Sequence, residues 1–83
     1  MKVSVEIEPY DDGIGIKWVD GSEITCAEDH GAFLIKANSE GLQLLASICL
    51  TLAQDEAPKH THVHLDEYNF LEDGSVELII AKG

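Results

Sequence analysis

The stretch NSEGLQLLASICLTLAQ, residues 38–54, decides the fold class of this 83-residue chain. It predicts a helix, because apolar residues recur there at helical spacing. Asn38 or Ser39 can serve as the N-cap, and Glu40 suits the positive end of the helix dipole. The apolar face comprises Leu42, Leu45, Ala46, Cys49, Leu52 and Ala53, widened by Leu44 and Ile48, and leaves a narrow polar stripe at Gln43, Ser47, Thr51 and Gln54. We therefore expect a largely covered helix that lies across a sheet and stops before Pro58.

The segments on both sides of this helix alternate between apolar and polar residues, which predicts strands. The expected strands span residues 2–9, 14–19, 22–26 and 32–36 before the helix, and 60–68 and 75–82 after it. Their expected inward residues are Val3, Val5, Ile7, Ile14, Ile16, Trp18, Ile24, Cys26, Phe33, Ile35, Thr61, Val63, Leu65, Val76, Leu78 and Ile80. Turn signals lie at 11–13, 20–21, 28–31 and 72–74. The predicted fold is α+β: a mostly antiparallel sheet of about six strands in the order ββββαββ, with one helix packed on one face, in a single domain spanning residues 1–83.

The chain is strongly acidic, with 16 Asp and Glu against 5 Lys and no Arg, a net charge of -11 and a pI near 4.4. Nucleic-acid binding and docking on an anionic membrane both need clustered basic residues, so the composition argues against both. A basic protein partner would suit this charge, whereas the alternative is that the acidity serves only to keep the protein dissolved. No signal peptide or bilayer-spanning run is apparent, so we expect a cytoplasmic protein.

One histidine-rich segment, His60-x-His62-x-His64-x-Asp66, stands out for its regular spacing. On a strand, alternate side chains lie on one face about 6.6 Å apart, close enough for two imidazoles to share a zinc ion. His60, His62 and His64 are therefore candidate metal ligands, with Asp66 as a further one. The competing interpretation is a surface or interface strand, because no residues that would support a metal centre are identifiable. We accordingly assign no cofactor.

No catalytic constellation is apparent, so the sequence favours a binding protein over an enzyme. Cys26 and Cys49 both fall on predicted core faces, and no serine lies in a nucleophile motif. The predicted outer sheet face mixes apolar residues with acids and histidines, which is typical of a protein-binding surface. It carries Glu6, Glu8, Lys17, Val19, Leu34, Lys36, His62, His64, Asp66, Ile79 and Ala81. A homodimer that pairs an open sheet edge or face remains an alternative.

Four short segments of the chain resemble a known family. Residues 38–42 (NSEGL) and 50–54 (LTLAQ), followed by His62-x-His64-Leu65-Asp66-Glu67 and Gly74-Ser75-x-Glu77-Leu78-Ile79-Ile80, are similar to the immunity protein 32 family of bacterial polymorphic toxin systems. The resemblance implies a cytoplasmic protein that binds and neutralises a cognate toxin by occlusion. Many such toxins are basic nucleases, which an acidic inhibitor would complement. By motif match and charge, the predicted partner-binding residues are Glu6, Glu8, His62, His64, Asp66 and Glu67.

Overall fold

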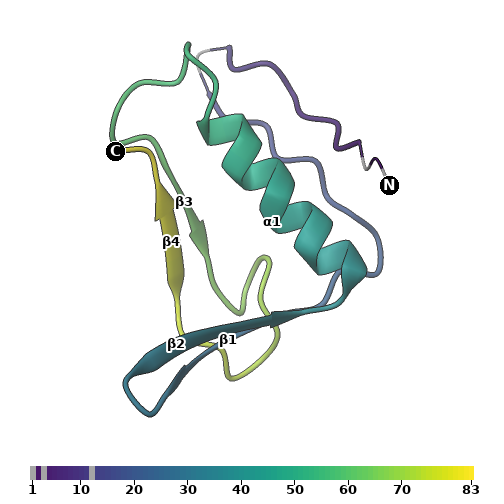
Figure 1. The fold of residues 1–83 in the computed structure, drawn as a ribbon, viewed down its shortest axis with the longest axis vertical. Helices are drawn as coiled ribbons and strands as arrows, with labels where there is room; N and C mark the ends of the chain where they lie inside the picture. Colours follow the sequence, from purple (N-terminus) through teal and green to yellow (C-terminus); the bar gives the residue numbers. More distant parts are fainter. Residues whose placement is uncertain (1, 3, 12) are drawn as a thin grey trace.

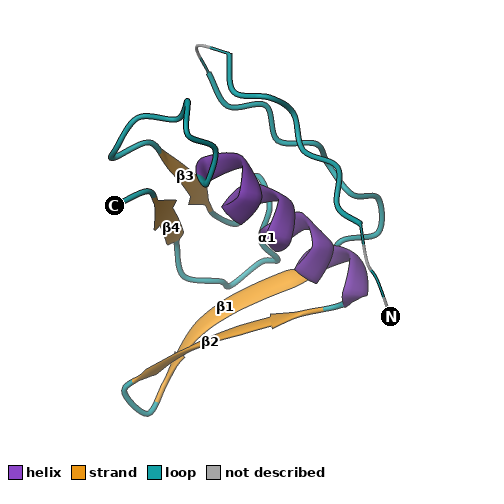
Figure 2. Ribbon diagram, turned by 45° about the horizontal axis from the view of Figure 1, so that its top comes forward, coloured by secondary structure: helices purple, strands orange, loops and turns teal. Residues whose placement is uncertain are grey.

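A computed structural model describes residues 2, 4–11 and 13–83. The elements follow the order β1 (Ile24–Asp29), β2 (Ala32–Ala37), α1 (Ser39–Leu52), β3 (His62–Leu65) and β4 (Leu78–Ala81). β1 pairs with β2 and β3 with β4, both antiparallel, in two separate two-stranded sheets (Figures 1 and 2). The α+β class is as predicted. The prediction of a single sheet of about six strands is wrong, because the described residues form four strands in two sheets.

The N-terminal segments 2–9 and 14–19, predicted as the first two strands, contain no strand among their described residues. Val3 lies outside those residues, as does Asp12 of the predicted turn. The two segments still run beside each other in an antiparallel sense (Figure 2). Glu6 pairs with Lys17, and a Cβ added at Gly15 would lie 3.5 Å from the Glu8 side chain. The predicted alternation holds at residues 14–17, since Ile14 and Ile16 pack against the core while Gly15 and Lys17 are exposed. It is wrong at the next two residues, because Trp18, predicted to point inward, is exposed and Val19, predicted to face outward, packs against the core. Where it holds, alternation thus reports which side faces the core, not whether backbone groups are paired.

The two segments and the turn between them form an N-terminal arm, the described residues of 2–19. Some of its backbone groups form hydrogen bonds with a side chain instead of a neighbouring strand. The Gln54 side-chain oxygen accepts from the Tyr10 N–H at 2.9 Å, and its nitrogen donates to the Glu8 carbonyl at 3.0 Å. Gln54 lies just past the end of α1, so the arm is tied to the helix. These bonds replace part of the ladder that a strand would have needed.

The segments predicted as the last two strands, 60–68 and 75–82, shorten to the four residues of β3 and of β4. At the start of the first, His60 has a positive φ of 72°, which interrupts the extended backbone. At its end, Asp66 begins a turn in which its carboxylate accepts from the Tyr68 N–H at 2.9 Å. Before β4, Val76 donates to the Cys26 carbonyl and Cys26 donates to the Ser75 hydroxyl, so residues 75–76 follow the edge of β1.

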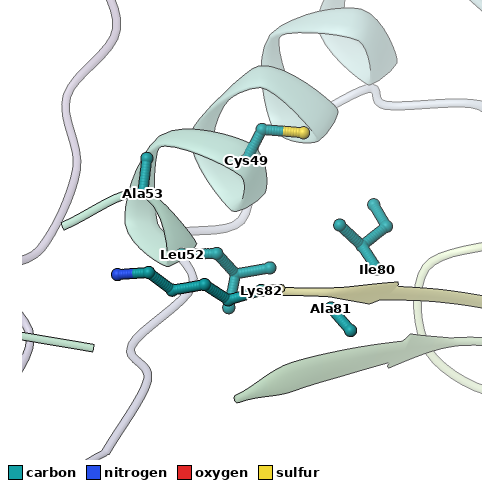
Figure 3. Close-up of a pocket in the computed structure, with 6 residues that line it drawn as sticks. All are labelled: Cys49, Leu52, Ala53, Ile80, Ala81 and Lys82. Atoms are coloured by element: carbon teal, nitrogen blue, oxygen red, sulfur yellow. The ribbon is translucent and has the colours of Figure 1, made fainter. Parts of the chain in front are cut away.

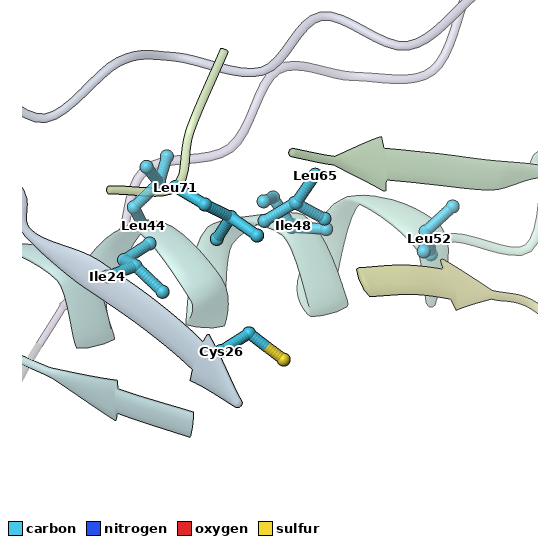
Figure 4. Close-up of a cluster of buried hydrophobic side chains, with 7 residues drawn as sticks. All are labelled: Ile24, Cys26, Leu44, Ile48, Leu52, Leu65 and Leu71. Atoms are coloured by element: carbon cyan, nitrogen blue, oxygen red, sulfur yellow. The ribbon is translucent and has the colours of Figure 1, made fainter. Parts of the chain in front are cut away.

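The core lies where α1 meets the two sheets (Figure 4). Its buried apolar residues are Ile24, Cys26, Leu44, Ile48, Leu52, Leu65 and Leu71. The buried face of α1 is rotated from the predicted one, because Leu42 and Cys49 are exposed while Ser47 and Thr51 are buried. The two hydroxyls donate within the helix, Ser47 to the Leu44 carbonyl and Thr51 to the Ser47 carbonyl, so their burial leaves no donor unpaired.

The N-terminus of α1 is anchored by Asn38, one of the two predicted N-caps. Its side-chain oxygen accepts from the Gly41 N–H at 2.8 Å and from the Glu23 N–H at 3.0 Å. Its side-chain nitrogen donates to the Gly21 carbonyl at 2.8 Å. One amide therefore connects the helix start, the residue before β1 and the preceding turn.

Replacing Asn38 with alanine should lower the free energy of unfolding by about 1–2 kcal/mol, since the cap and both tertiary bonds are lost. Asn38→Asp is the matched control, because it keeps the two accepted bonds and loses only the donor to Gly21. Urea unfolding should rank wild type above Asn38→Asp and Asn38→Asp above Asn38→Ala. Equal midpoints for the alanine variant and wild type would refute this role.

Candidate functional site

The predicted partner-binding residues lie in two places. Glu6 and Glu8 belong to the N-terminal arm, whereas His62 and His64 belong to β3, and the arm and β3 flank different sides of α1 (Figure 1). The predicted common outer face required a continuous sheet, which the structure does not contain. The candidates must therefore be considered as separate surfaces.

On the N-terminal arm, Glu6 accepts a hydrogen bond from the Lys17 ammonium at 3.0 Å, with both side chains largely exposed. This hydrogen bond and the negative charge of Glu6 raise the pKa of Lys17. Such an exposed pair contributes little to stability. Glu8 is also exposed, and its backbone carbonyl holds Gln54. The arm thus presents carboxylates to solvent, one of them already paired with a lysine.

The outer face of the β3–β4 hairpin carries the histidines. His62 lies opposite Ala81 and His64 opposite Ile79, all four exposed, while Val63 and Ile80 pack against the core on the other face. The imidazole centroids of His62 and His64 are 4.9 Å apart, edge to face. His64 Nδ1 lies 3.5 Å from a carboxylate oxygen of Glu77. The alternation predicted for this strand is confirmed over 62–65.

A metal centre on this face lacks a third ligand. His60 precedes β3 with a positive φ, and its carbonyl oxygen contacts Nδ1 of His62 at 3.0 Å. The Asp66 carboxylate accepts from the Tyr68 N–H instead of aligning with the imidazoles. Within the described ranges, no three His, Cys, Asp or Glu side chains are placed to hold an ion together.

Asp66 and Glu67 help to shape the loop between β3 and β4. Glu67 accepts from the Gly74 N–H at 3.1 Å, across the base of this loop. Asn69 donates to the His64 carbonyl and accepts from the Asp66 N–H. The loop displays Tyr68, whose side chain is 90 % exposed. These two acids therefore hold the loop in shape, whatever they also contact.

The β1–β2 hairpin is the surface that sequence reasoning missed. Phe33 and Ile35 were predicted to point inward, yet they are 77 % and 42 % exposed, and Leu34 on the opposite face is 47 % exposed. Phe33 and Ile35 share a face with the buried Ile24 and Cys26, but the hairpin extends past the core toward its tip (Figure 2). The available signal was the run Phe33-Leu34-Ile35, apolar on both alternating faces.

A two-residue turn joins these strands. Asp29 lies opposite Ala32, and both intervening residues, His30 and Gly31, have positive φ. That geometry matches the twist of antiparallel strands and rigidly connects them. The predicted turn at 28–31 is confirmed. It carries acidic residues beside the apolar ones, because Glu28 lies directly across from Phe33 and Asp29 follows it.

A shallow hollow of about 250 Å³ lies between the C-terminal part of α1 and β4, lined by Cys49, Leu52, Ala53, Ile80, Ala81 and Lys82 (Figure 3). Its walls are mainly apolar. The Lys82 ammonium donates to the Gln54 and Ala57 carbonyls at 2.6 and 2.9 Å. This lysine therefore places a positive charge just beyond the C-terminal end of α1, which has no basic residue in its last turn. None of the six lining residues is an acid or a histidine that could act as a base beside Cys49.

Comparison with known proteins identifies the family. No curated protein and no solved structure matches this chain. In the part of the chain that the structure describes, no helix is long and apolar enough to cross a lipid bilayer. A family model described as immunity protein 32 matches residues 32–83, which include β2, α1, β3 and β4. It confirms the resemblance seen in residues 38–42, 50–54, 62–67 and 74–80. The chain therefore belongs to the immunity protein 32 family.

Proposed function

We propose that this protein binds a cognate toxin and neutralises it by covering part of its surface, without catalysing a reaction. The observation that carries the proposal is the family match over residues 32–83, a segment that holds most of the exposed apolar side chains. The net charge of -11 favours a basic partner, such as a nuclease whose phosphate-binding surface would be occluded. The protein would act in the cytoplasm, as a single folded domain.

Electrostatic attraction should make this association sensitive to salt. Exposed charges are screened over about 10 Å at 0.1 M salt and over about 3 Å at 1 M. We expect the Kd for the toxin encoded by the neighbouring gene, purified in a catalytically inactivated form, to rise about tenfold or more between low and high salt. Isothermal titration calorimetry at several salt concentrations measures this directly. A toxin that is not bound at low salt would overturn the proposed function.

Matched variants then separate local contacts from overall charge. Glu6→Gln/Glu8→Gln removes two negative charges from the arm, and Asp55→Asn/Glu56→Gln removes the same charge beyond the end of α1. A larger loss of toxin affinity for the first variant would place the arm in the interface. Equal losses would assign the effect to net charge alone.

The outer face of β3–β4 is tested in the same titrations with His62→Ala/His64→Ala. We propose that these imidazoles are polar contacts to the toxin, with Asp66 and Glu67 supplying charge beside them. We expect the double variant to bind the inactivated toxin more weakly than wild type, because the hydrogen bonds of two imidazoles to the toxin are lost. A raised Kd would support the contact, and an unchanged Kd would exclude it.

A further inference from the structure

The free edge of β2 leaves backbone groups available for pairing. Register places Glu23 opposite Asn38, and the Glu23 carbonyl accepts from the Asn38 N–H at 3.1 Å. On the other edge of β1, the carbonyls of Ile24 and Cys26 accept from the N–H groups of Glu72 and Val76, at 2.8 and 2.9 Å. Backbone groups of successive strand residues point to opposite edges, so the odd-numbered residues of β1 face β2.

The same alternation fixes the orientation of β2. Thr25, Ala27 and Asp29 lie opposite Lys36, Leu34 and Ala32, so these are the residues that share ladder bonds. The N–H and C=O groups of Phe33 and Ile35 consequently point away from β1. No described residue donates to or accepts from these groups. β2 therefore ends the sheet with an unpaired row of donors and acceptors.

The side chains on this edge make it unusual among unpaired edges. Natural proteins protect such edges with prolines, bulges or several charges, but β2 has six residues, no proline and one lysine. The two residues whose backbone points outward are Phe33 and Ile35, both exposed and apolar. An extended segment that added here would gain backbone hydrogen bonds and bury apolar surface at the same positions.

We propose that the toxin adds an extended segment as a third strand along β2, an inference that rests on the proposed function. The backbone groups of Phe33 and Ile35 demand an extended occupant, because only such a segment offers donors and acceptors at matching spacing. Glu28, which lies directly across from Phe33 on β1, and Asp29, at the end of β1, place negative charge near the hairpin tip. The occupant is therefore a toxin segment with apolar residues facing Phe33 and Ile35 and with basic residues near the hairpin tip. A second copy of this chain fits less well, since each copy carries a charge of -11.

Ile35→Pro tests the backbone contribution. Proline removes the outward N–H of residue 35 and leaves the ladder to β1 intact, a position that edge strands tolerate. We expect the affinity for the inactivated toxin to fall about tenfold to hundredfold, because a buried acceptor on the toxin loses its donor. Ile35→Ala keeps the N–H and should lose less affinity for the toxin than Ile35→Pro. Leu50→Ala, on the exposed side of α1, should bind the toxin like wild type. Equal affinities for Ile35→Pro and Ile35→Ala would overturn the proposal.

Hydrogen exchange on the wild-type protein provides a second measurement that needs no variant to fold. In the free protein, the amides of Phe33 and Ile35 should exchange faster than those of Leu34 and Lys36. In the complex, they should become protected. Toxin binding without this protection overturns strand addition while the proposed function stands, whereas no toxin binding refutes the proposed function itself. Protection in the free protein together with a doubled mass by light scattering would instead identify a second copy as the occupant.

Discussion

Replacing Ile48 with alanine is expected to lower the free energy of unfolding by about 2–5 kcal/mol. Ile48 is fully buried, and Figure 4 shows it midway along the row of α1 side chains that enters the core, between Leu44 and Leu52. Alanine would remove three carbons from a position with no access to water and leave a cavity that neighbouring elements cannot fully close. For a chain of this length, whose total stability is about 4–12 kcal/mol, that loss is a large fraction.

The control for this substitution lies two residues further along the same helix. Leu50 is 46 % exposed, so Leu50→Ala changes helix propensity by a similar small amount but removes little buried surface. Urea unfolding monitored by circular dichroism gives the free energy of unfolding of each variant. It should fall strongly for Ile48→Ala and change by no more than about 1 kcal/mol for Leu50→Ala. Similar decreases for both variants would mean that burial at position 48 does not control stability.

A second large effect is expected at Gly41, where a substitution that normally favours helices should be harmful. Glycine in a helix usually costs about 1 kcal/mol relative to alanine. At Gly41, however, a Cβ would lie 2.6 Å from the Glu23 carbonyl oxygen and 2.9 Å from Cγ1 of Ile24. That carbonyl is held by the Asn38 N–H and cannot move away freely. We expect Gly41→Ala to destabilise the protein by about 1–3 kcal/mol, because the helix must shift from β1.

Gln43→Ala is the matched control, since residue 43 is exposed on the same helix. It should leave stability unchanged or raise it slightly, in accord with alanine's helix propensity. Thermal unfolding of both variants separates the two outcomes. A Gly41→Ala variant with the wild-type Tm or a higher one would show that α1 does not approach β1 as closely as the structure indicates.

The helix and the β1–β2 hairpin could be predicted because their signals are local. The cap at Asn38, the apolar spacing of α1 and the turn at His30–Gly31 each depend on a few adjacent residues. Which face of α1 is buried depended on contacts distant in sequence. At Gly41 the helix backbone approaches β1 closely. The hydroxyls of Ser47 and Thr51 donate hydrogen bonds to helix carbonyls, so both residues can be buried. The apparent polar stripe therefore enters the interior, and Cys49 is left exposed.

The candidate site was less predictable, because it depended on how the strands assemble. The exposure of the His62 and His64 side chains followed from alternation alone. Their separation from Glu6 and Glu8 did not, since period-two patterns at 2–9 and 14–19 are equally consistent with a strand or with an extended arm lying on the core. Exposure of Phe33 did not follow from alternation either, because its position is core-facing and only the length of the hairpin carries it beyond the core.

The different environments of the two cysteines offer a direct way to follow opening of the molecule. Cys26 is a buried residue of β1, whereas Cys49 lies exposed on α1. A thiol reagent would therefore modify one sulfur in the folded protein and the second only when the core separates. The rate of that second modification, in a chain with no engineered label, reports how often the hairpin that bears Phe33 and Ile35 detaches from the helix.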